Sequence, residues 1–107
     1  MIYVIATFTI KPNNRTKFLE IFKNIIPTVQ NELGCIEYFP TIDINSGLSL
    51  QTIDENVVTI IEKWANLETL NNHIKSKHMQ IFIEKITNII ENTTVKILQK
   101  IDDVNHG

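Results

Sequence analysis

Residues 60–78, IIEKWANLETLNNHIKSKH, decide the fold because the periodicity of their apolar residues changes at Asn66. Before Asn66 the pattern is typical of a strand, and after it apolar residues recur every three or four positions, as in a helix. The same stretch holds the only Trp, Trp64, and two of the three histidines, His73 and His78. Polar and aromatic groups at a strand-to-helix junction are typical of a small-molecule pocket, so we expect a binding site here.

Outward from this stretch, apolar periodicity predicts the order β-α-β-β-α-α-β. Strands are expected at residues 2–10, 35–43, 57–65 and 93–101, and helices at residues 15–33, 67–74 and 76–92. In the third strand, Val58, Ile60, Glu62 and Trp64 are expected on one face.

Single residues mark several of these boundaries. Asn66 and Ser76 are expected to cap the two later helices, and Gly34 is expected to end the first one with a positive φ. Pro27 lies inside the first helical pattern and is expected to kink or loosen it. Residues 44–56 are the least patterned stretch, although a strand could extend around residues 48–53.

The element order predicts an α+β fold of the ferredoxin-like, split βαβ type, in which helices cover one face of an antiparallel sheet. Residues 1–107 are expected to form one domain, with a core at about residues 2–101 and a frayed tail at residues 102–107. The Ile-rich strands look apolar on both faces, so a second copy is expected to cover the free face, giving a homodimer.

Composition excludes several classes of partner. The formal net charge of −2 leaves no basic stripe for nucleic acid and no polybasic membrane anchor. The apolar runs are shorter than the roughly 20 residues that span a bilayer. Cys35 is the only cysteine, so no internal disulfide can form, and we expect a cytoplasmic protein.

Two motifs give the chain a family resemblance. The first is Glu62-Lys63-Trp64 followed by Leu67, Leu70 and the run HIKSKH at residues 73–78; the second is ELGCIEY at residues 32–38. Together with the opening strand that ends in Lys11-Pro12, they resemble the antibiotic biosynthesis monooxygenase (ABM) domain family over about residues 2–101. The resemblance implies two ferredoxin-like protomers forming a dimeric α/β barrel. It also implies either cofactor-independent oxidation of polycyclic phenols and quinols or heme degradation.

The heme-degrading branch fits less well. Its members carry an Asn in the first strand, a Trp on the short helix and a His further along as the iron ligand. Residues 2–10 contain no Asn, His73 stands where that Trp would align, and Ile83 stands where the ligand would be sought. The spacing of His73 and His78 resembles the quinol monooxygenase branch instead, which leaves heme binding as the weaker alternative.

The residues of the expected site are assigned as follows. His73 is expected to be catalytic, taking a proton from a phenol or hydrogen-bonding its oxygen, because a neutral imidazole suits this role at neutral pH. Trp64, Tyr38 and His78 are expected to bind substrate; the alternatives are a core role for Trp64, the sheet edge for Tyr38, and capping or packing for His78. No metal site is expected, because no Cys or nearby acidic cluster completes the histidine pair.

These expectations favour a cofactor-independent monooxygenase that oxidises a quinol or related small aromatic substrate with dioxygen. In such enzymes the resemblance implies that the deprotonated substrate itself reduces dioxygen. The alternative is a non-catalytic, dimeric small-molecule-binding or stress-response protein with the same fold. The loop at residues 44–56 would help set the substrate class if it folded over the pocket.

Overall fold

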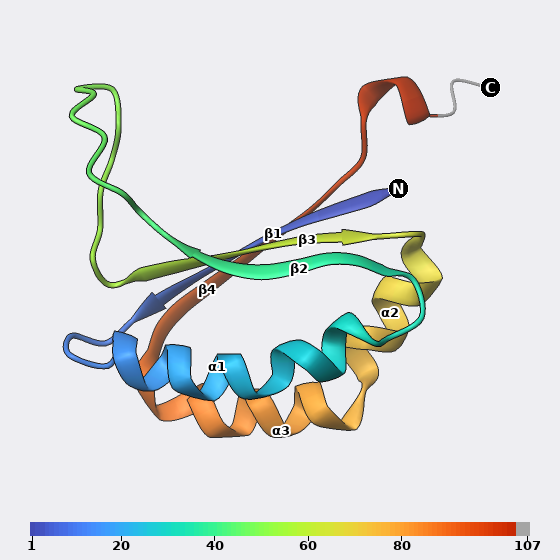
Figure 1. Cartoon of the computed structure of the whole chain (residues 1–107), viewed down its shortest axis with the longest axis horizontal. Helices are drawn as coiled ribbons and strands as arrows, with labels where there is room; N and C mark the ends of the chain where they lie inside the picture. Colours follow the sequence, from blue (N-terminus) through green and yellow to red (C-terminus); the bar gives the residue numbers. More distant parts are fainter. Residues whose placement is uncertain (105–107) are drawn as a thin grey trace.

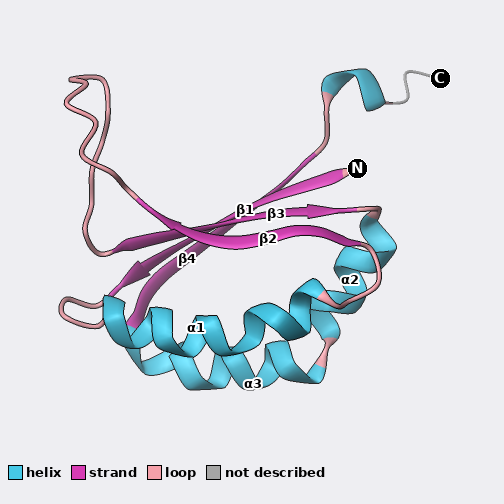
Figure 2. Cartoon of the chain, in the orientation of Figure 1, coloured by secondary structure: helices cyan, strands magenta, loops and turns pink. Residues whose placement is uncertain are grey.

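The computed structural model describes residues 1–104, in which a layer of helices covers one face of a four-stranded sheet (Figures 1 and 2). The elements are β1 (Ile2–Ile10), α1 (Arg15–Gln30), β2 (Cys35–Ile42), β3 (Val57–Trp64), α2 (Leu67–Lys75), α3 (Lys77–Ile86), the 3-10 helix η1 (Thr87–Ile89), β4 (Ile90–Leu98) and the 3-10 helix η2 (Ile101–Asp103). All strand pairs are antiparallel, in the order β2-β3-β1-β4. This topology confirms the predicted ferredoxin-like α+β fold.

The face of the sheet that packs against the helices carries the core. Burial alternates strictly along β1 and β3, so the even-numbered residues of both strands point toward the helices. In β3 these residues include Val58, Ile60, Glu62 and Trp64, which confirms that they share one face. Cross-strand pairing extends this inner face, with Tyr38 of β2 opposite Glu62 and Ile97 of β4 opposite Val4. Aromatic rings fill the space between sheet and helices, from Phe8, Phe18, Phe22 and Phe82.

Two predicted helix ends are wrong. α1 ends at Gln30 rather than residue 33, because the chain leaves the helix in a tight turn where the Glu32 amide donates to the Val29 carbonyl. Leu33 is therefore 87% exposed instead of packing on the helix's apolar face. α3 ends at Ile86 rather than residue 92, and β4 begins at Ile90, because pairing with β1 draws the β-branched residues there into the sheet.

The predicted caps are confirmed. Asn66 accepts a hydrogen bond from the Thr69 amide at the start of α2, and Ser76 accepts one from the Met79 amide at the start of α3. Gly34 has the predicted positive φ, at +84°. α1 continues through Pro27 up to Gln30.

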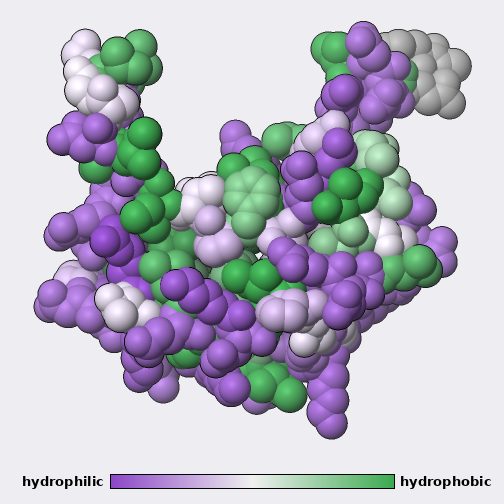
Figure 3. Space-filling model, in the orientation of Figure 1, coloured by the Kyte–Doolittle hydropathy of each residue, from purple (hydrophilic) through white to green (hydrophobic). Residues whose placement is uncertain are grey.

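Two arms rise from the sheet face that the helices leave free, as Figure 1 shows. One is the loop at residues 43–56, which contains no strand, and the other is the C-terminal segment with η2. Exposed aliphatic side chains lie on both arms, for example Leu50 at 87% and Ile101 at 80% exposure, and Figure 3 shows hydrophobic side chains on both sides of the hollow between them. The loop thus extends away from the helix side instead of folding over it. The predicted tail reaches residues 105–107, which lie outside the described residues.

None of the helices in residues 1–104 combines the length and the apolarity that crossing a membrane requires.

Candidate active site

A cavity of about 470 Å³ lies between the inner face of the sheet and the helices. All four strands contribute to its walls, which are mostly aliphatic and aromatic. Its ionisable lining residues are Tyr38 of β2, Glu62 of β3 and His73 of α2. A mostly apolar cavity of this size with a few convergent polar groups is typical of a small-molecule site.

Each of these three side chains turns a polar atom toward the cavity. Among the described residues, every fully buried side-chain nitrogen or oxygen atom has a hydrogen-bond partner. The Tyr38 hydroxyl, Glu62 Oε2 and His73 Nε2 make no hydrogen bond within this part of the chain, so each must border open space. Because the three side chains are only 3–7% exposed, that space is the cavity they line.

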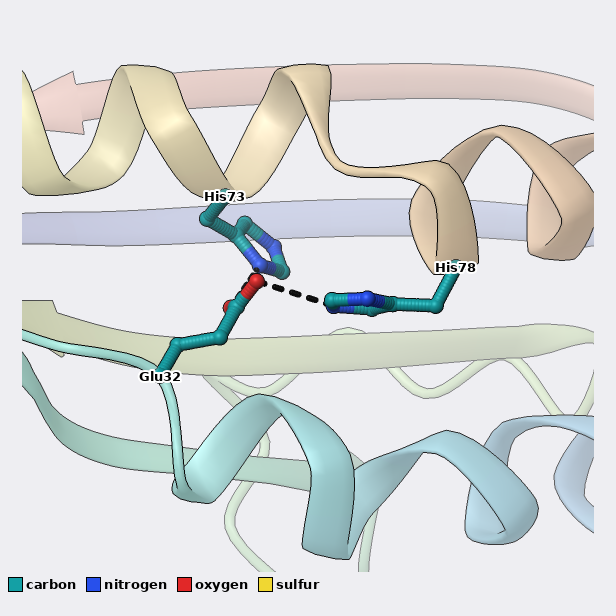
Figure 4. Close-up of side chains that lie close together, drawn as sticks. All are labelled: Glu32, His73 and His78. Carbon is teal, nitrogen blue, oxygen red and sulfur yellow. Dashed lines mark hydrogen bonds and ion pairs between the residues drawn. The ribbon is translucent and has the colours of Figure 1, made fainter.

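The His73 imidazole is held by Glu32, whose Oε2 lies 2.6 Å from His73 Nδ1 (Figure 4). A carboxylate can only accept, so Nδ1 carries the proton and Nε2 keeps its lone pair toward the cavity. Burial lowers the pKa of His73 below its usual value, and this effect outweighs the opposing hydrogen bond and charge of Glu32. His73 is therefore neutral at pH 7 and suited to accept a proton.

Glu32 reaches His73 because the turn after α1 points it back toward α2. Its second oxygen, Oε1, lies 2.8 Å from His78 Nε2, so one carboxylate joins both histidines, as Figure 4 shows. The helix break at Ser76 permits this arrangement, since a continuous helix would separate positions five residues apart onto different faces. His78 is 29% exposed and does not line the cavity. The trio thus runs from the cavity wall toward the surface.

Glu62 is the second titratable acid–base group of the cavity. Trp64 Nε1 donates to Glu62 Oε1 at 2.8 Å, which fixes the carboxyl group and leaves Oε2 for the cavity. Burial raises the pKa of Glu62 to about 7, and the negative charge of Glu32 acts in the same direction. A carboxyl group with this pKa can both give and take a proton near neutral pH.

The structure places the predicted site residues at different depths. His73 and Tyr38 line the cavity, whereas Trp64 is fully buried and packs on the His73 ring with 4.6 Å between ring centroids. Trp64 therefore contacts the cavity residue His73, and His78 contacts Glu32, the hydrogen-bond partner of His73. Neither Trp64 nor His78 lines the cavity. Glu32 was not assigned a role from the sequence, although it opens the ELGCIEY motif. The sequence predicts that Glu62 shares one face of β3 with Val58, Ile60 and Trp64, and the structure shows that this face points toward the helices.

Glu32, His73 and His78 could also hold a metal ion, because each offers one ligand atom and these atoms lie within 4.8 Å of one another. Sequence reasoning missed this grouping because Glu32 is distant along the chain from both histidines. The 2.6 Å separation of His73 Nδ1 and Glu32 Oε2 is that of a charge-assisted hydrogen bond, whereas His78 Nε2 lies 2.8 Å from Glu32 Oε1 and 3.1 Å from Ser76 Oγ.

Comparison with known proteins assigns the chain to a family. The model of the antibiotic biosynthesis monooxygenase family matches residues 1–85. The chain belongs to this family. It is 32% identical over 101 residues to the "probable quinol monooxygenase YgiN" of Escherichia coli strain K12, a match that covers 92% of this chain and 97% of YgiN. The Shigella flexneri protein of that name matches equally well.

Solved structures of low sequence identity share the fold of this ABM chain. A conserved protein from Methanosarcina mazei Go1 superposes with a TM-score of 0.80 at 24% identity, over 92% of this chain and 91% of that one. Rv0793 from Mycobacterium tuberculosis superposes with a TM-score of 0.79 at 19% identity, over 97% and 98% of the two chains. These likenesses concern the arrangement of sheet and helices.

Proposed function

We propose that this ABM-family chain is a cofactor-independent monooxygenase that oxidises a phenol or quinol with dioxygen. The observation that carries the proposal is the pair formed by His73 and Glu62, two proton-carrying groups with opposite pKa shifts in one apolar cavity. Groups whose environments push their pKa values in opposite directions are typical of acid–base sites. Membership of the family and the likeness to YgiN support the same reaction class.

His73 begins the proposed reaction by taking the phenolic proton on Nε2. The imidazolium that forms is stabilised by the Glu32 carboxylate on Nδ1. Burial, with a smaller contribution from Glu62, raises the pKa of Tyr38 above its ordinary range, so its hydroxyl stays protonated. That hydroxyl is available to donate a hydrogen bond to the substrate oxyanion.

The phenolate then reduces dioxygen without a cofactor. One electron passes from the ring to dioxygen, and the resulting radical and superoxide combine to form a carbon–oxygen bond, giving a peroxide anion. The His73 imidazolium returns its proton to the distal oxygen. The O–O bond breaks as protonated Glu62 donates to the departing hydroxide, and the ring C–H proton restores Glu62. One oxygen atom stays in the quinone product, and the other leaves as water with the two protons lost by the phenol.

Oxygen uptake by the purified protein tests this proposal, with a panel of dihydroxynaphthalene-type quinols and simple phenols as substrates. Uptake should exceed the autoxidation rate and fall about 100-fold or more in His73→Gln, because general base catalysis contributes on that scale. Lys75→Gln, an exposed side chain on the same helix, is the matched control and should retain wild-type uptake.

One result would contradict the proposed reaction, and another would contradict only the role of His73. Tight binding of these aromatics without uptake would indicate the alternative, a binding protein of the same fold. Uptake that persists in His73→Gln would keep the monooxygenase and remove His73 as its base.

We also propose that the protein works as a homodimer through the sheet face opposite the helices. Phe39, Ile61 and Ile5 form an apolar row across three strands of this face, and the two arms flank it. Phe39 is 40% exposed in the single chain, and burying it between two copies would remove this apolar surface from water. A cytoplasmic location remains the expectation from the lone Cys35.

A further inference from the structure

A second groove lies beside the cavity at the edge of the sheet. This groove, of about 420 Å³, lies between α2 and β4 and is lined by Leu67, Glu68, Leu70, Asn71, Ile74 and Ile97; we call it the α2–β4 groove. Leu70, Ile74 and Ile97 also line the cavity. The two spaces are therefore neighbours that share these three side chains as a common wall.

The cavity is open on this side because β4 is an edge strand whose inner face lacks helix cover. Four aliphatic side chains of the cavity wall are about half exposed there: Ile74 at 52%, Ile83 at 53%, Val95 at 55% and Ile97 at 51%. They come from α2, α3 and β4. Exposed aliphatic groups gathered at the mouth of a cavity mark a surface that a ligand or partner covers.

Polar and apolar groups lie at opposite ends of the cavity and the groove taken together. Tyr38, Glu62, Val4 and Ile97 form one row across the four strands. Because neighbouring strands are about 4.8 Å apart, Ile97 lies roughly 10 Å across the sheet from Glu62. A ligand that fills both ends must carry its oxygen functions at one end and an apolar group at the other.

The groove itself selects for a neutral apolar group. Leu67, Leu70, Ile74 and Ile97 supply most of its lining, and none of its lining residues is a cation. Glu68 on its rim would repel an anionic group. Leu67, the first residue of α2, is 60% exposed and borders this groove.

We propose that the α2–β4 groove binds the aliphatic substituent of an alkylated phenol or quinol whose ring lies in the cavity. The ring's position rests on the proposed function, with its hydroxyl at His73. The substituent passes between Ile74 and Ile97 and packs against Leu67. The site thus takes amphiphilic aromatics in preference to unsubstituted rings.

Calorimetric titration of the full chain with 4-alkylphenols, from phenol itself to the octyl compound, tests the groove without requiring turnover. Affinity should rise about fourfold for each methylene that becomes buried and level off once the chain extends past the groove. Leu67→Gln, which changes a residue of the groove alone, should flatten this rise while leaving the affinity for phenol itself unchanged. Ile74→Gln, which changes a residue shared by both spaces, should also flatten the rise. Ile81→Gln, an Ile on α3 that is 41% exposed and lines neither space, is the matched control and should keep the wild-type rise.

The outcomes separate this inference from the proposed function. Phenol binding without dependence on chain length would overturn the groove and leave the proposed function intact. A rise with chain length that is equally steep in Leu67→Gln and Ile74→Gln would also overturn the groove, because the chain would then lie elsewhere. Failure of every compound to bind would overturn both.

Discussion

Glu32 shows how one side chain outside any helix or strand can organise a site. One oxygen of its carboxylate accepts a hydrogen bond from the buried His73, and the other contacts the partly exposed His78. The first of these bonds sets the tautomer of His73 and hence the direction of its lone pair. The sequence predicts His73 as the central residue, because it stands out by type and motif. It does not predict its partner, because the contact spans 41 positions of the chain.

Glu32→Gln should impair the proposed reaction by changing the His73 tautomer. A Gln side chain can donate to Nδ1, which would place the imidazole proton on Nε2 and remove the base. We expect kcat to fall by about 10- to 1,000-fold with little change in KM. Oxygen uptake measures the rate, and the ring-nitrogen NMR signals of His73 report the tautomer directly.

His78→Gln is the matched control for this variant. It removes the other histidine on Glu32 but keeps the bond to His73, so it should leave the His73 tautomer unchanged. If Glu32→Gln also left that tautomer unchanged, Glu32 would have no positioning role.

Glu62 should make the stability of the fold depend on pH. Its folded pKa of about 7 lies above the ordinary value of 4.5, so the protonated form is favoured by the fold. This contribution is fully present below pH 4.5 and is lost as pH rises through about 7, a difference of about 3 kcal/mol. The Gln side chain of Glu62→Gln cannot ionise. The free energy of unfolding of this variant, relative to wild type, should therefore rise by about that much between pH 5 and pH 8.

Urea unfolding of both proteins at the two pH values measures this gain. Glu84→Gln, which removes an exposed carboxylate on α3, is the control and should behave like wild type. An equal effect of Glu62→Gln at both pH values would show that the Glu62 carboxyl does not titrate in this range. His73 acts in the opposite sense, because its lowered pKa removes stability as pH falls below about 6.5.

At the scale of elements, the sequence predicts the β3–α2 junction well and the end of α3 poorly. The junction is marked by a change of period and by Asn66, whose capping hydrogen bond is local. Residues 86–90 are rich in Ile and fit a helix or a strand equally well. Their fate depends on pairing with β1, where Ile10 lies opposite Ile90 next to a register shift. The local sequence pattern of residues 86–90 does not indicate this pairing with a distant strand.

Gly34 joins three elements, and Gly34→Ala tests that connection. An added Cβ would lie 2.5 Å from the Thr69 side chain, which belongs to the capping box of α2. Together with the positive φ, this clash should lower the free energy of unfolding by about 2 kcal/mol or more. The rate of the proposed reaction should also fall, because Glu32 lies two residues away.

Gly47→Ala is a matched control for this prediction. Gly47 has a similar φ of +76°, but an added Cβ would have no neighbour within 4 Å. Urea unfolding of the two variants therefore isolates the contact with Thr69. Equal losses in both would assign the whole effect to backbone strain.

At the scale of the whole molecule, the sheet has one face for the cavity and one free face. The order of strands and helices predicts this division, because it determines which face the helices cover. The free face is less uniformly apolar than the Ile-rich sequence suggests: a row of threonines, Thr41, Thr59, Thr7 and Thr94, crosses all four strands beside the Phe39 row. Sequence pattern alone could not separate these rows, since it lacks the register.

Phe39→Asp should convert the proposed dimer to a monomer. A charge in the apolar row would be buried without a partner in an interface that must cover about 1,000 Å² or more to be stable. Ile81→Asp changes an equally exposed residue on α3, at 41% against 40%, and should leave the dimer intact. Light scattering after size-exclusion chromatography measures the mass of each variant. A wild-type protein with the mass of one chain would contradict the dimer.

The position of Trp64 gives the protein a native optical reporter. It is the only indole of the chain, it is shielded from solvent, and it touches both His73 and Glu62. Because an imidazolium quenches indole emission more strongly than a neutral imidazole, the fluorescence of the unlabelled protein should dim when His73 becomes protonated. The fluorescence should also respond to the charge on Glu62, whose Oε1 accepts a hydrogen bond from the indole N–H. Protonation events in the cavity can thus be watched by emission, without a dye and without turnover.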